Sequence, residues 1–279
     1  MTRRWPSTHT ASAALGAADV GVRIVSGIIL GALAIVVIAH GGVIFFFVAT
    51  LLAMVGLNEF YRITRRYRPI GLGGFVSLLV LCWAAWFKTP PYVFATIALA
   101  VLLVALLGMA AGPKPGVTAR MAVTLLGLVY IGLGIGHMML LRHLPHGAGL
   151  LLTVVFGTWA GDTMAYFVGN FFGVTPMAPK LSPKKTWEGF VGGALGTVLF
   201  VVFLGFYNSL GAAKSLLVGI VIAVVVPVGD LFESLLKRDV GVKDAGRFMP
   251  GHGGVLDRFD ALLFSTVAVY YVLTLVLHV

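Results

Sequence analysis

The chain has 279 residues, of which 59% are apolar and 11% are charged, and its mean hydropathy is +1.01. A soluble domain carries about 25% charged residues, so this chain has too few polar side chains to cover a soluble surface. Composition therefore predicts an integral membrane protein and excludes the soluble domains that the length alone would allow. The net charge of +10 comes without a long basic tract, so it does not indicate nucleic-acid binding. The single cysteine, Cys82, excludes an intrachain disulfide.

A polar start is followed by nine apolar segments, each near the roughly 20 residues that a bilayer-spanning helix needs. They cover residues 24–39, 43–61, 71–87, 92–111, 121–141, 149–172, 188–207, 215–233 and 258–278. We therefore predict an all-α, polytopic membrane protein with about nine transmembrane helices. The predicted organisation is a flexible cytoplasmic tail over 1–22, N-terminal transmembrane helices over 23–150 and a C-terminal catalytic transmembrane region over 151–279.

Lys and Arg are distributed unevenly between loops on alternate sides of the predicted membrane. Beginning with the tail, every second loop belongs to a set that holds 17 of the 20 basic residues. The positive-inside rule then places the N-terminus in the cytoplasm and the C-terminus outside. The predicted location of the chain is the inner (plasma) membrane. The loops after the sixth and eighth segments face the cytoplasm in this prediction, where a water-soluble nucleotide is available. The arginines of residues 62–68 are interpreted as a signal for topology and lipid headgroup contact.

Charge is concentrated between the last two apolar segments, in residues 229–260. This stretch, GDLFESLLKRDVGVKDAGRFMPGHGGVLDRFD, holds six of the chain's ten acidic residues and five of its twenty Lys and Arg. Because charge beside lipid is unfavourable, the pattern indicates a functional site at the cytoplasmic membrane boundary. If the helix continues beyond the eighth segment, Asp230, Glu233 and Lys237 share one face. The glycine-rich residues 243–254 cannot form a regular helix, and their backbone N–H groups suit phosphate binding.

Asp257 and Asp260 open the last apolar segment, three positions apart and therefore on one helix face. Acidic residues near a helix N-terminus are favoured by the helix dipole in any protein. However, Asp257 can meet Asp230 across two adjacent helices, and two converging carboxylates repel each other unless a cation lies between them. We therefore predict that Asp230 and Asp257 bind Mg²⁺ together with nucleotide phosphates. A second cation is left open.

A second charged loop follows the sixth segment. Its lysines, at positions 180, 184 and 185, suit phosphate binding, and Thr186 is positioned to cap the next helix. Asp162, inside the preceding apolar segment, is another carboxylate at membrane depth.

Two blocks of sequence carry a resemblance to a known family. The first comprises SLLKR (234–238), Lys243-Asp244, His252-Gly253-Gly254 and Asp257-Arg258-Phe259-Asp260. The second comprises GDTMAY (161–166) and APKLSPKKTWEG (178–189), which contains Ser-Pro-x-Lys-Thr-x-Glu-Gly. Together they resemble the bacterial phosphatidate cytidylyltransferases, also called CDP-diacylglycerol synthases. Met249 departs mildly from that family, which usually has Leu, Ile or Phe there. The resemblance covers residues 157–265, and the first 150 residues match only as apolar spans.

The resemblance implies a nucleotidyltransferase of phospholipid biosynthesis that converts CTP and phosphatidate into CDP-diacylglycerol and pyrophosphate. It implies catalytic roles for Lys237, Arg238, Lys243, Asp244, His252 and Asp260, substrate binding by Asp162, Ser182, Lys185, Thr186, Glu188 and Arg258, and Mg²⁺ binding by Asp230 and Asp257. The implied partners are CTP, phosphatidate and membrane lipid, without nucleic acid, and a homodimer is left open. Because the lipid phosphate is already anionic, it can attack the α-phosphorus of CTP without a strong general base.

Two classes of alternative stay open. A CTP-dependent lipid kinase would release CDP in place of pyrophosphate, whereas a CDP-alcohol phosphotransferase needs a D-G-x-x-A-R motif that the sequence lacks. A transporter also uses intramembrane carboxylates, but one built from inverted repeats should show paired broken helices in its two halves. Here the acidic residues lie almost entirely in the second half, which disfavours transport.

Overall fold

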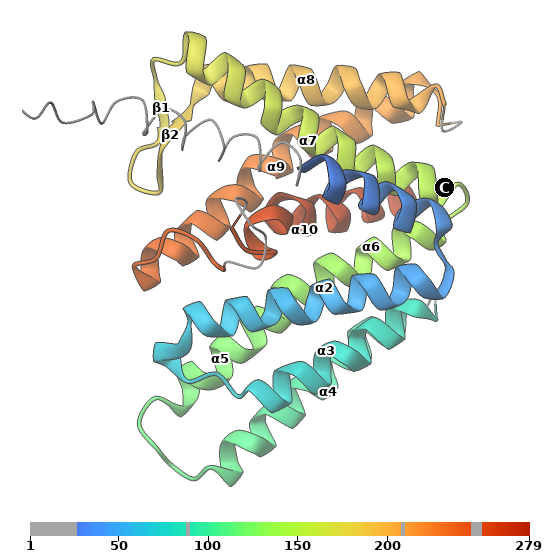
Figure 1. Ribbon diagram of the computed structural model, residues 1–279. Helices are drawn as coiled ribbons and strands as arrows, with labels where there is room; N and C mark the ends of the chain where they lie inside the picture. Colours follow the sequence, from blue (N-terminus) through green and yellow to red (C-terminus); the bar gives the residue numbers. More distant parts are fainter. Residues whose placement is uncertain (1–26, 88–89, 208–209, 247–252) are drawn as a thin grey trace, which may run out of the picture.

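The computed structural model describes residues 27–87, 90–207, 210–246 and 253–279. It is a bundle of helices that reverse direction from one to the next (Figure 1). The elements are the helix Gly27–His40, α2 (Gly42–Ile63), the 3₁₀ turn η1 (Arg65–Tyr67), α3 (Gly71–Trp86), α4 (Pro90–Ala110), α5 (Val117–Gly127), the π-helical turn η2 (Leu128–Gly132), α6 (Leu133–His143), α7 (Gly147–Phe172), β1 (Pro176–Ala178), β2 (Ser182–Thr186), α8 (Trp187–Gly205), α9 (Ala212–Val240), α10 (Leu256–Tyr271) and the π-helical turn η3 (Val272–Val276).

Helices dominate because backbone polar groups find no water in a bilayer and must bond within the chain. Among the described residues, seven helices are long and apolar enough to cross a membrane. Two more apolar helices, Gly27–His40 and α3, are shorter than the roughly 20 residues that a full span needs. The all-α, polytopic membrane fold is therefore confirmed, whereas the count of nine spans stays a prediction.

The continuous helix Val117–His143, made of α5, η2 and α6, lies at the centre of the bundle. Its most apolar stretch is 72% buried, compared with 28% for α4 at the periphery. The central helix packs against α2, α3, α7 and α10. On the outer helices, large apolar side chains such as Leu102 and Leu199 are exposed, as expected where the surrounding solvent is lipid.

The connections that follow α2, α4, α7 and α9 lie at one end of the bundle, on the left in Figure 1. This follows from the alternating direction of the helices. The same connections belong to the set in which the sequence concentrates Lys and Arg. The two chemically rich loops, after α7 and after α9, are therefore neighbours in space as well as members of the same predicted side.

Within the described residues, the only strands form a two-stranded antiparallel hairpin of β1 and β2 between α7 and α8. The hairpin departs from the purely helical prediction. Proline at positions 176, 179 and 183 prevents this stretch from continuing as a helix, since proline removes a backbone donor and disrupts a helix interior. At its end, the Thr186 hydroxyl accepts a hydrogen bond from the Gly189 N–H at 3.1 Å, which confirms the predicted cap of α8.

Candidate active site

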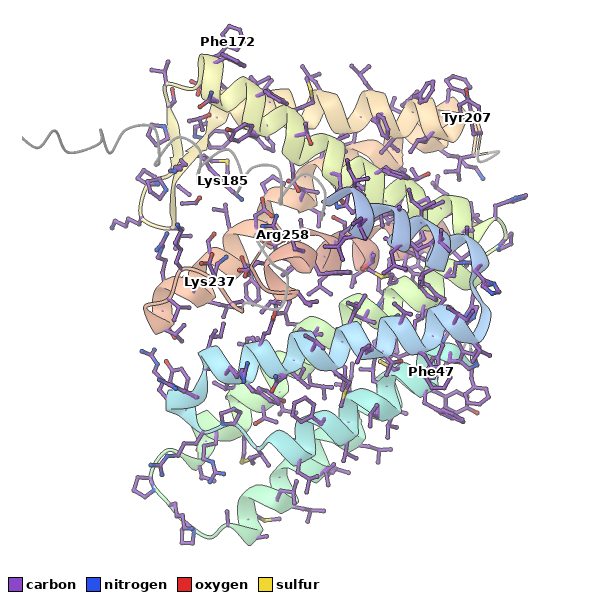
Figure 2. All side chains as sticks on the ribbon, viewed as in Figure 1. Phe47, Phe172, Lys185, Tyr207, Lys237 and Arg258 are labelled. Atoms are coloured by element: carbon purple, nitrogen blue, oxygen red, sulfur yellow. The ribbon has the colours of Figure 1, made fainter. Side chains whose placement is uncertain are left out.

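A cavity of about 1030 Å³ lies between the hairpin and helices α7 to α10. The sequence-predicted site residues that line it are Asp162, Ser182, Lys185, Thr186, Asp230, Lys237, Lys243, Asp244, Asp257, Arg258 and Asp260. Figure 2 shows Lys185, Lys237 and Arg258 in this region, on three different elements. The structure therefore brings the two sequence blocks together around one cavity.

The wall of the cavity has an apolar part and a charged part. Trp159 on α7 and Ala223, Val226 and Pro227 on α9 supply an apolar part. The lysines and carboxylates of the hairpin, the C-terminal part of α9 and the start of α10 supply the charged part. Such a cavity can accept a ligand that is anionic at one end and apolar at the other.

The carboxylates meet where α9 and α10 approach each other. At Gly229 a Cβ atom would lie only 2.7 Å from the backbone oxygen of Asp260, so this approach requires glycine. As a result, Asp230 on α9 and Asp260 on α10 interact electrostatically, and Asp162 on α7 contributes a further negative group. Three helices thus direct carboxylates toward one part of the cavity.

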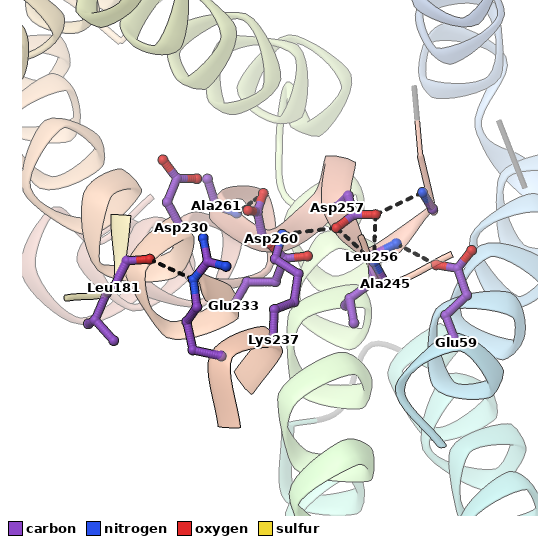
Figure 3. A network of polar contacts seen from close by, with 12 residues as sticks. Glu59, Leu181, Asp230, Glu233, Lys237, Ala245, Leu256, Asp257, Asp260 and Ala261 are labelled. Atoms are coloured by element: carbon purple, nitrogen blue, oxygen red, sulfur yellow. Dashed lines mark hydrogen bonds and ion pairs between the residues drawn. The ribbon is translucent and has the colours of Figure 1, made fainter. Parts of the chain in front are cut away.

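Two lysines offset part of this negative charge. Lys185 Nζ on β2 lies 2.5 Å from Asp230 Oδ2. Lys237 on α9 forms ion pairs with Glu233 one turn earlier and with Asp257 on α10, the latter at 3.0 Å (Figure 3). Glu233 is only 2% exposed, so its pairing with Lys237 avoids an isolated buried charge. The helix α9 continues to Val240, which confirms the predicted one-face arrangement of Asp230, Glu233 and Lys237.

Asp257 has a different set of partners from Asp230. Its carboxylate accepts hydrogen bonds from the Ala245 N–H at 2.9 Å and from the Gly254 N–H at 2.9 Å, in addition to Lys237 (Figure 3). It therefore ties the α9–α10 connection to the start of α10. Asp260 on α10 also interacts electrostatically with Asp230. The pairing of Asp230 with Asp257 stays a prediction, and the structure adds Asp260 as a second α10 carboxylate near Asp230.

The oxygen ligands at the cavity suit a hard cation. Within the described residues, no group of three or more His, Cys, Asp or Glu is arranged to hold a metal ion by itself. Mg²⁺, however, usually takes one or two protein carboxylates and completes its shell with water and substrate phosphates. Asp230 and Asp260, adjacent to a cavity large enough for a nucleotide, fit that mode of binding.

Two predicted site residues do not line the cavity, and a third cannot be placed relative to it. Arg238 is exposed, and its Nε donates a hydrogen bond to the Leu181 backbone oxygen at 3.2 Å, which joins α9 to the hairpin. The Glu188 carboxylate accepts hydrogen bonds from the Val174 and Thr175 N–H groups, each at 3.1 Å, and so holds the hairpin base. His252 lies outside the described residues.

Sequence reasoning missed Glu59, which lies on α2 in the N-terminal part of the chain. Its side chain is buried and accepts a hydrogen bond from the Leu256 N–H at 2.9 Å, at the first residue of α10. The signal was available, because an acidic residue inside the apolar segment 43–61 is a candidate for function by default.

Comparison with known proteins adds independent findings. The model of the cytidylyltransferase family matches residues 21–276. A phosphatidate cytidylyltransferase of Synechocystis sp. is 34% identical over an alignment that covers 92% of this chain and 97% of the relative. Those of Aquifex aeolicus and Mycobacterium bovis are 45% and 39% identical over 44% and 58% of this chain. In these two matches the chain spans about half of the relative, 46% and 54% of its length.

Proposed function

Because the chain belongs to the cytidylyltransferase family, we propose that it transfers CMP from CTP to phosphatidate, giving CDP-diacylglycerol and pyrophosphate in phospholipid biosynthesis. One observation carries the proposal most directly. Lysines and carboxylates of the hairpin and of α9–α10 surround one cavity that also has an apolar wall. The match to this family favours cytidylyl transfer over the CTP-dependent kinase.

In the proposed reaction, a phosphate oxygen of phosphatidate forms a bond to the α-phosphorus of CTP. The bond from that phosphorus to the bridging oxygen of the β-phosphate breaks, and pyrophosphate leaves. Since the attacking phosphate is already anionic, the protein does not have to remove a proton from an alcohol. Its main tasks are to bring two anions together in line and to neutralise their charge.

The charged side chains divide these tasks. Lys185 on β2 and Lys237 on α9 both line the cavity. Together with Lys243 and Arg258, they are proposed to bind substrate phosphates. Ser182, Thr186 and Asp244 line the same cavity and are proposed to complete the substrate site. Lys185 forms an ion pair with Asp230, and Lys237 forms one with Asp257. These ion pairs fix both lysines in position before substrate binds.

We propose Mg²⁺ as the cofactor, held by Asp230 with Asp257 and Asp260 facing it from α10. When bound, Mg²⁺ would neutralise the phosphates of CTP and orient them. Asp162 interacts with Asp230 from α7 and would increase the affinity of this part of the cavity for cations. Asp257 also fixes the connection that carries Lys243, so its proposed role combines binding with positioning.

The chain is a multi-pass membrane protein, and phosphatidate is a membrane lipid. We propose that the N-terminus and the cavity end of the bundle face the cytoplasm in the inner membrane, on the basis of the excess of Lys and Arg in those loops. The lipid then enters laterally, with its acyl chains against the apolar wall near Trp159 and Val226. The nucleotide enters from the aqueous side.

The position of a radioactive label distinguishes the proposed reaction from the kinase. Purified full-length protein is incubated with Mg²⁺ and lipid, and CTP carries ³²P in either the α- or the γ-phosphate. We expect α-label, and no γ-label, in the lipid product when phosphatidate is present, with release of pyrophosphate. EDTA should abolish the transfer. Appearance of γ-label in lipid, with CDP as the second product, would replace the proposal with the kinase.

A further inference from the structure

Glu59 links the N-terminal helices to the cavity. It lies on α2, its side chain is only 4% exposed, and its Oε2 accepts the Leu256 N–H at 2.9 Å (Figure 3). Leu256 is the first residue of α10, whose opening N–H groups lack partners within the helix. A carboxyl group from a helix nearly 200 positions earlier in the chain therefore caps α10.

The α9–α10 connection closes tightly around the same carboxyl group. A Cβ atom at Gly246 or Gly254 would overlap the oxygens of Glu59, so the carboxyl group occupies the space that both glycines leave open. Gly246 follows Lys243 and Asp244, and Gly254 donates its N–H to Asp257. Glu59 thus contacts the described parts of the connection on both sides of residues 247–252.

The two oxygens of Glu59 are not equally satisfied. Among the described residues, Glu59 Oε1 is buried and has no hydrogen-bond partner. A buried polar atom without a partner is unfavourable for folding. Deviations of this kind are expected where a residue serves a functional site.

We propose that Glu59 is a positioning residue that holds the start of α10 and the α9–α10 connection in the arrangement that the reaction requires. Its effect on the reaction is indirect. By fixing Leu256, Glu59 positions the next residues, Asp257 and Arg258. By packing on Gly246, it positions Lys243. Glu59 is not among the residues that line the cavity. This inference rests on the proposed function for its activity test but not for its structural test.

Two substitutions of Glu59 distinguish a positioning role, which depends on the hydrogen-bond acceptor, from an effect of its negative charge or of its volume. Glu59→Gln keeps an oxygen that can accept the Leu256 N–H, whereas Glu59→Met keeps a similar volume and removes the acceptor. We expect Glu59→Gln to stay within about threefold of the wild-type kcat/KM, and Glu59→Met to lose roughly tenfold to a hundredfold, because small misplacements of binding groups reduce rate this strongly. Gly246→Ala, which places a methyl group against the carboxyl group from the other side, should behave like Glu59→Met and carries the test if that variant does not fold.

Hydrogen exchange supplies a measurement that does not depend on activity. In Glu59→Met the amide of Leu256 should exchange faster than in the wild type, while in Glu59→Gln it should stay protected. Tyr61→Phe is the matched control on the same helix: it removes a buried hydrogen bond to the Thr124 oxygen, 3.0 Å long, which lies within the N-terminal helices. It should leave both kcat/KM and Leu256 exchange unchanged.

Three results would contradict the proposal. Near-normal kcat/KM in Glu59→Met would show that the acceptor is dispensable. Equal loss in Glu59→Gln and Glu59→Met, with Leu256 still protected, would assign the effect to charge. Equal loss in Glu59→Met and Tyr61→Phe, with a matching fall in Tm, would assign it to general stability. If the wild-type protein makes no CDP-diacylglycerol, the proposed function fails, and exchange at Leu256 still decides whether Glu59 holds α10.

Discussion

The N-terminal helices, residues 27–143, and the C-terminal helices, residues 147–279, use acidic side chains very differently. The C-terminal group contains eight acidic residues and the N-terminal group contains one, Glu59. Six of the eight line the cavity; the other two, Glu188 and Asp239, bind the hairpin and Arg66. Glu59, the acidic residue of the N-terminal group, does not line the cavity but accepts a hydrogen bond from the first residue of α10, which carries part of the site. In this bundle, an acidic residue inside an apolar segment therefore marks either the cavity or its support.

Basic residues divide less cleanly between the two regions. In the C-terminal group, Lys185 and Lys237 pair with carboxylates at the cavity. In the N-terminal group, the arginines around η1 lie at the end of α2 and are largely exposed. A membrane protein uses Lys and Arg for topology as well as for chemistry, so their presence alone is weaker evidence of a site.

Removing the carboxylate of Asp230 should have the largest effect, because this residue interacts with Lys185, Asp162 and Asp260 at once. Asp230→Asn preserves size and polarity. We expect a fall in kcat of roughly a hundredfold or more, since a metal-held phosphate contributes several kcal/mol to transition-state stabilisation. The measurement is CDP-diacylglycerol formation over a Mg²⁺ titration. Asp239→Asn on the exposed end of the same helix is the control, and similar rates in both variants would remove Asp230 from the site.

The same titration decides the partner of Asp230 on α10. If Asp260 binds the cation with Asp230, Asp260→Asn should raise the Mg²⁺ requirement, and the double variant should lose little more than either single one. If Asp257 serves mainly to anchor Ala245 and Gly254, Asp257→Asn should raise KM for CTP at an unchanged Mg²⁺ requirement. A raised Mg²⁺ requirement in Asp257→Asn would instead support the pairing predicted from sequence.

Much of this arrangement follows from local sequence. Apolar run length predicted the helical membrane fold, because a bilayer requires about 20 apolar residues per span. The i, i+3 and i+7 spacing placed Asp230, Glu233 and Lys237 on one face, and the continuous helix α9 confirms it. The convergence of the two loops at one end followed from the alternation of basic residues.

Contacts between distant segments could not be predicted in the same way. Neither spacing nor composition shows that Gly229 brings α9 against the backbone of Asp260, which is what places Asp260 beside Asp230. The contact between Glu59 and Leu256 joins two segments with no shared local pattern. The hairpin was missed because its three prolines indicate only that a helix ends, not which extended pairing follows.

Lys185 gives a second, smaller test of the C-terminal region. Lys185→Met removes a cation from the cavity and leaves Asp230 without its partner at 2.5 Å. We expect kcat/KM to fall roughly tenfold to a hundredfold, mainly through weaker substrate binding, because each charge-assisted hydrogen bond to a phosphate contributes about 1.5–3 kcal/mol. Lys180→Met, in the exposed turn of the same hairpin, is the matched control. Equal activity of the two variants would show that Lys185 pairs with Asp230 without serving the reaction.

The smallest effect should come from the ion pair that joins the two regions at the surface. Arg66 Nη2 lies 2.8 Å from Asp239 Oδ2, and the two side chains are 49% and 53% exposed. Water and salt screen such a pair, and its ordering opposes part of the attraction. Arg66→Gln and Asp239→Asn should therefore each stay within about twofold of the wild-type activity, and the double variant should not differ from them. Activity is measured at low and at physiological ionic strength with a fixed fraction of anionic lipid.

A tenfold loss of activity in Arg66→Gln but not in Asp239→Asn would mean that this arginine binds substrate or a lipid headgroup directly. The N-terminal loops would then belong to the site. The division of the molecule into a supporting N-terminal region and a reacting C-terminal region would then be wrong.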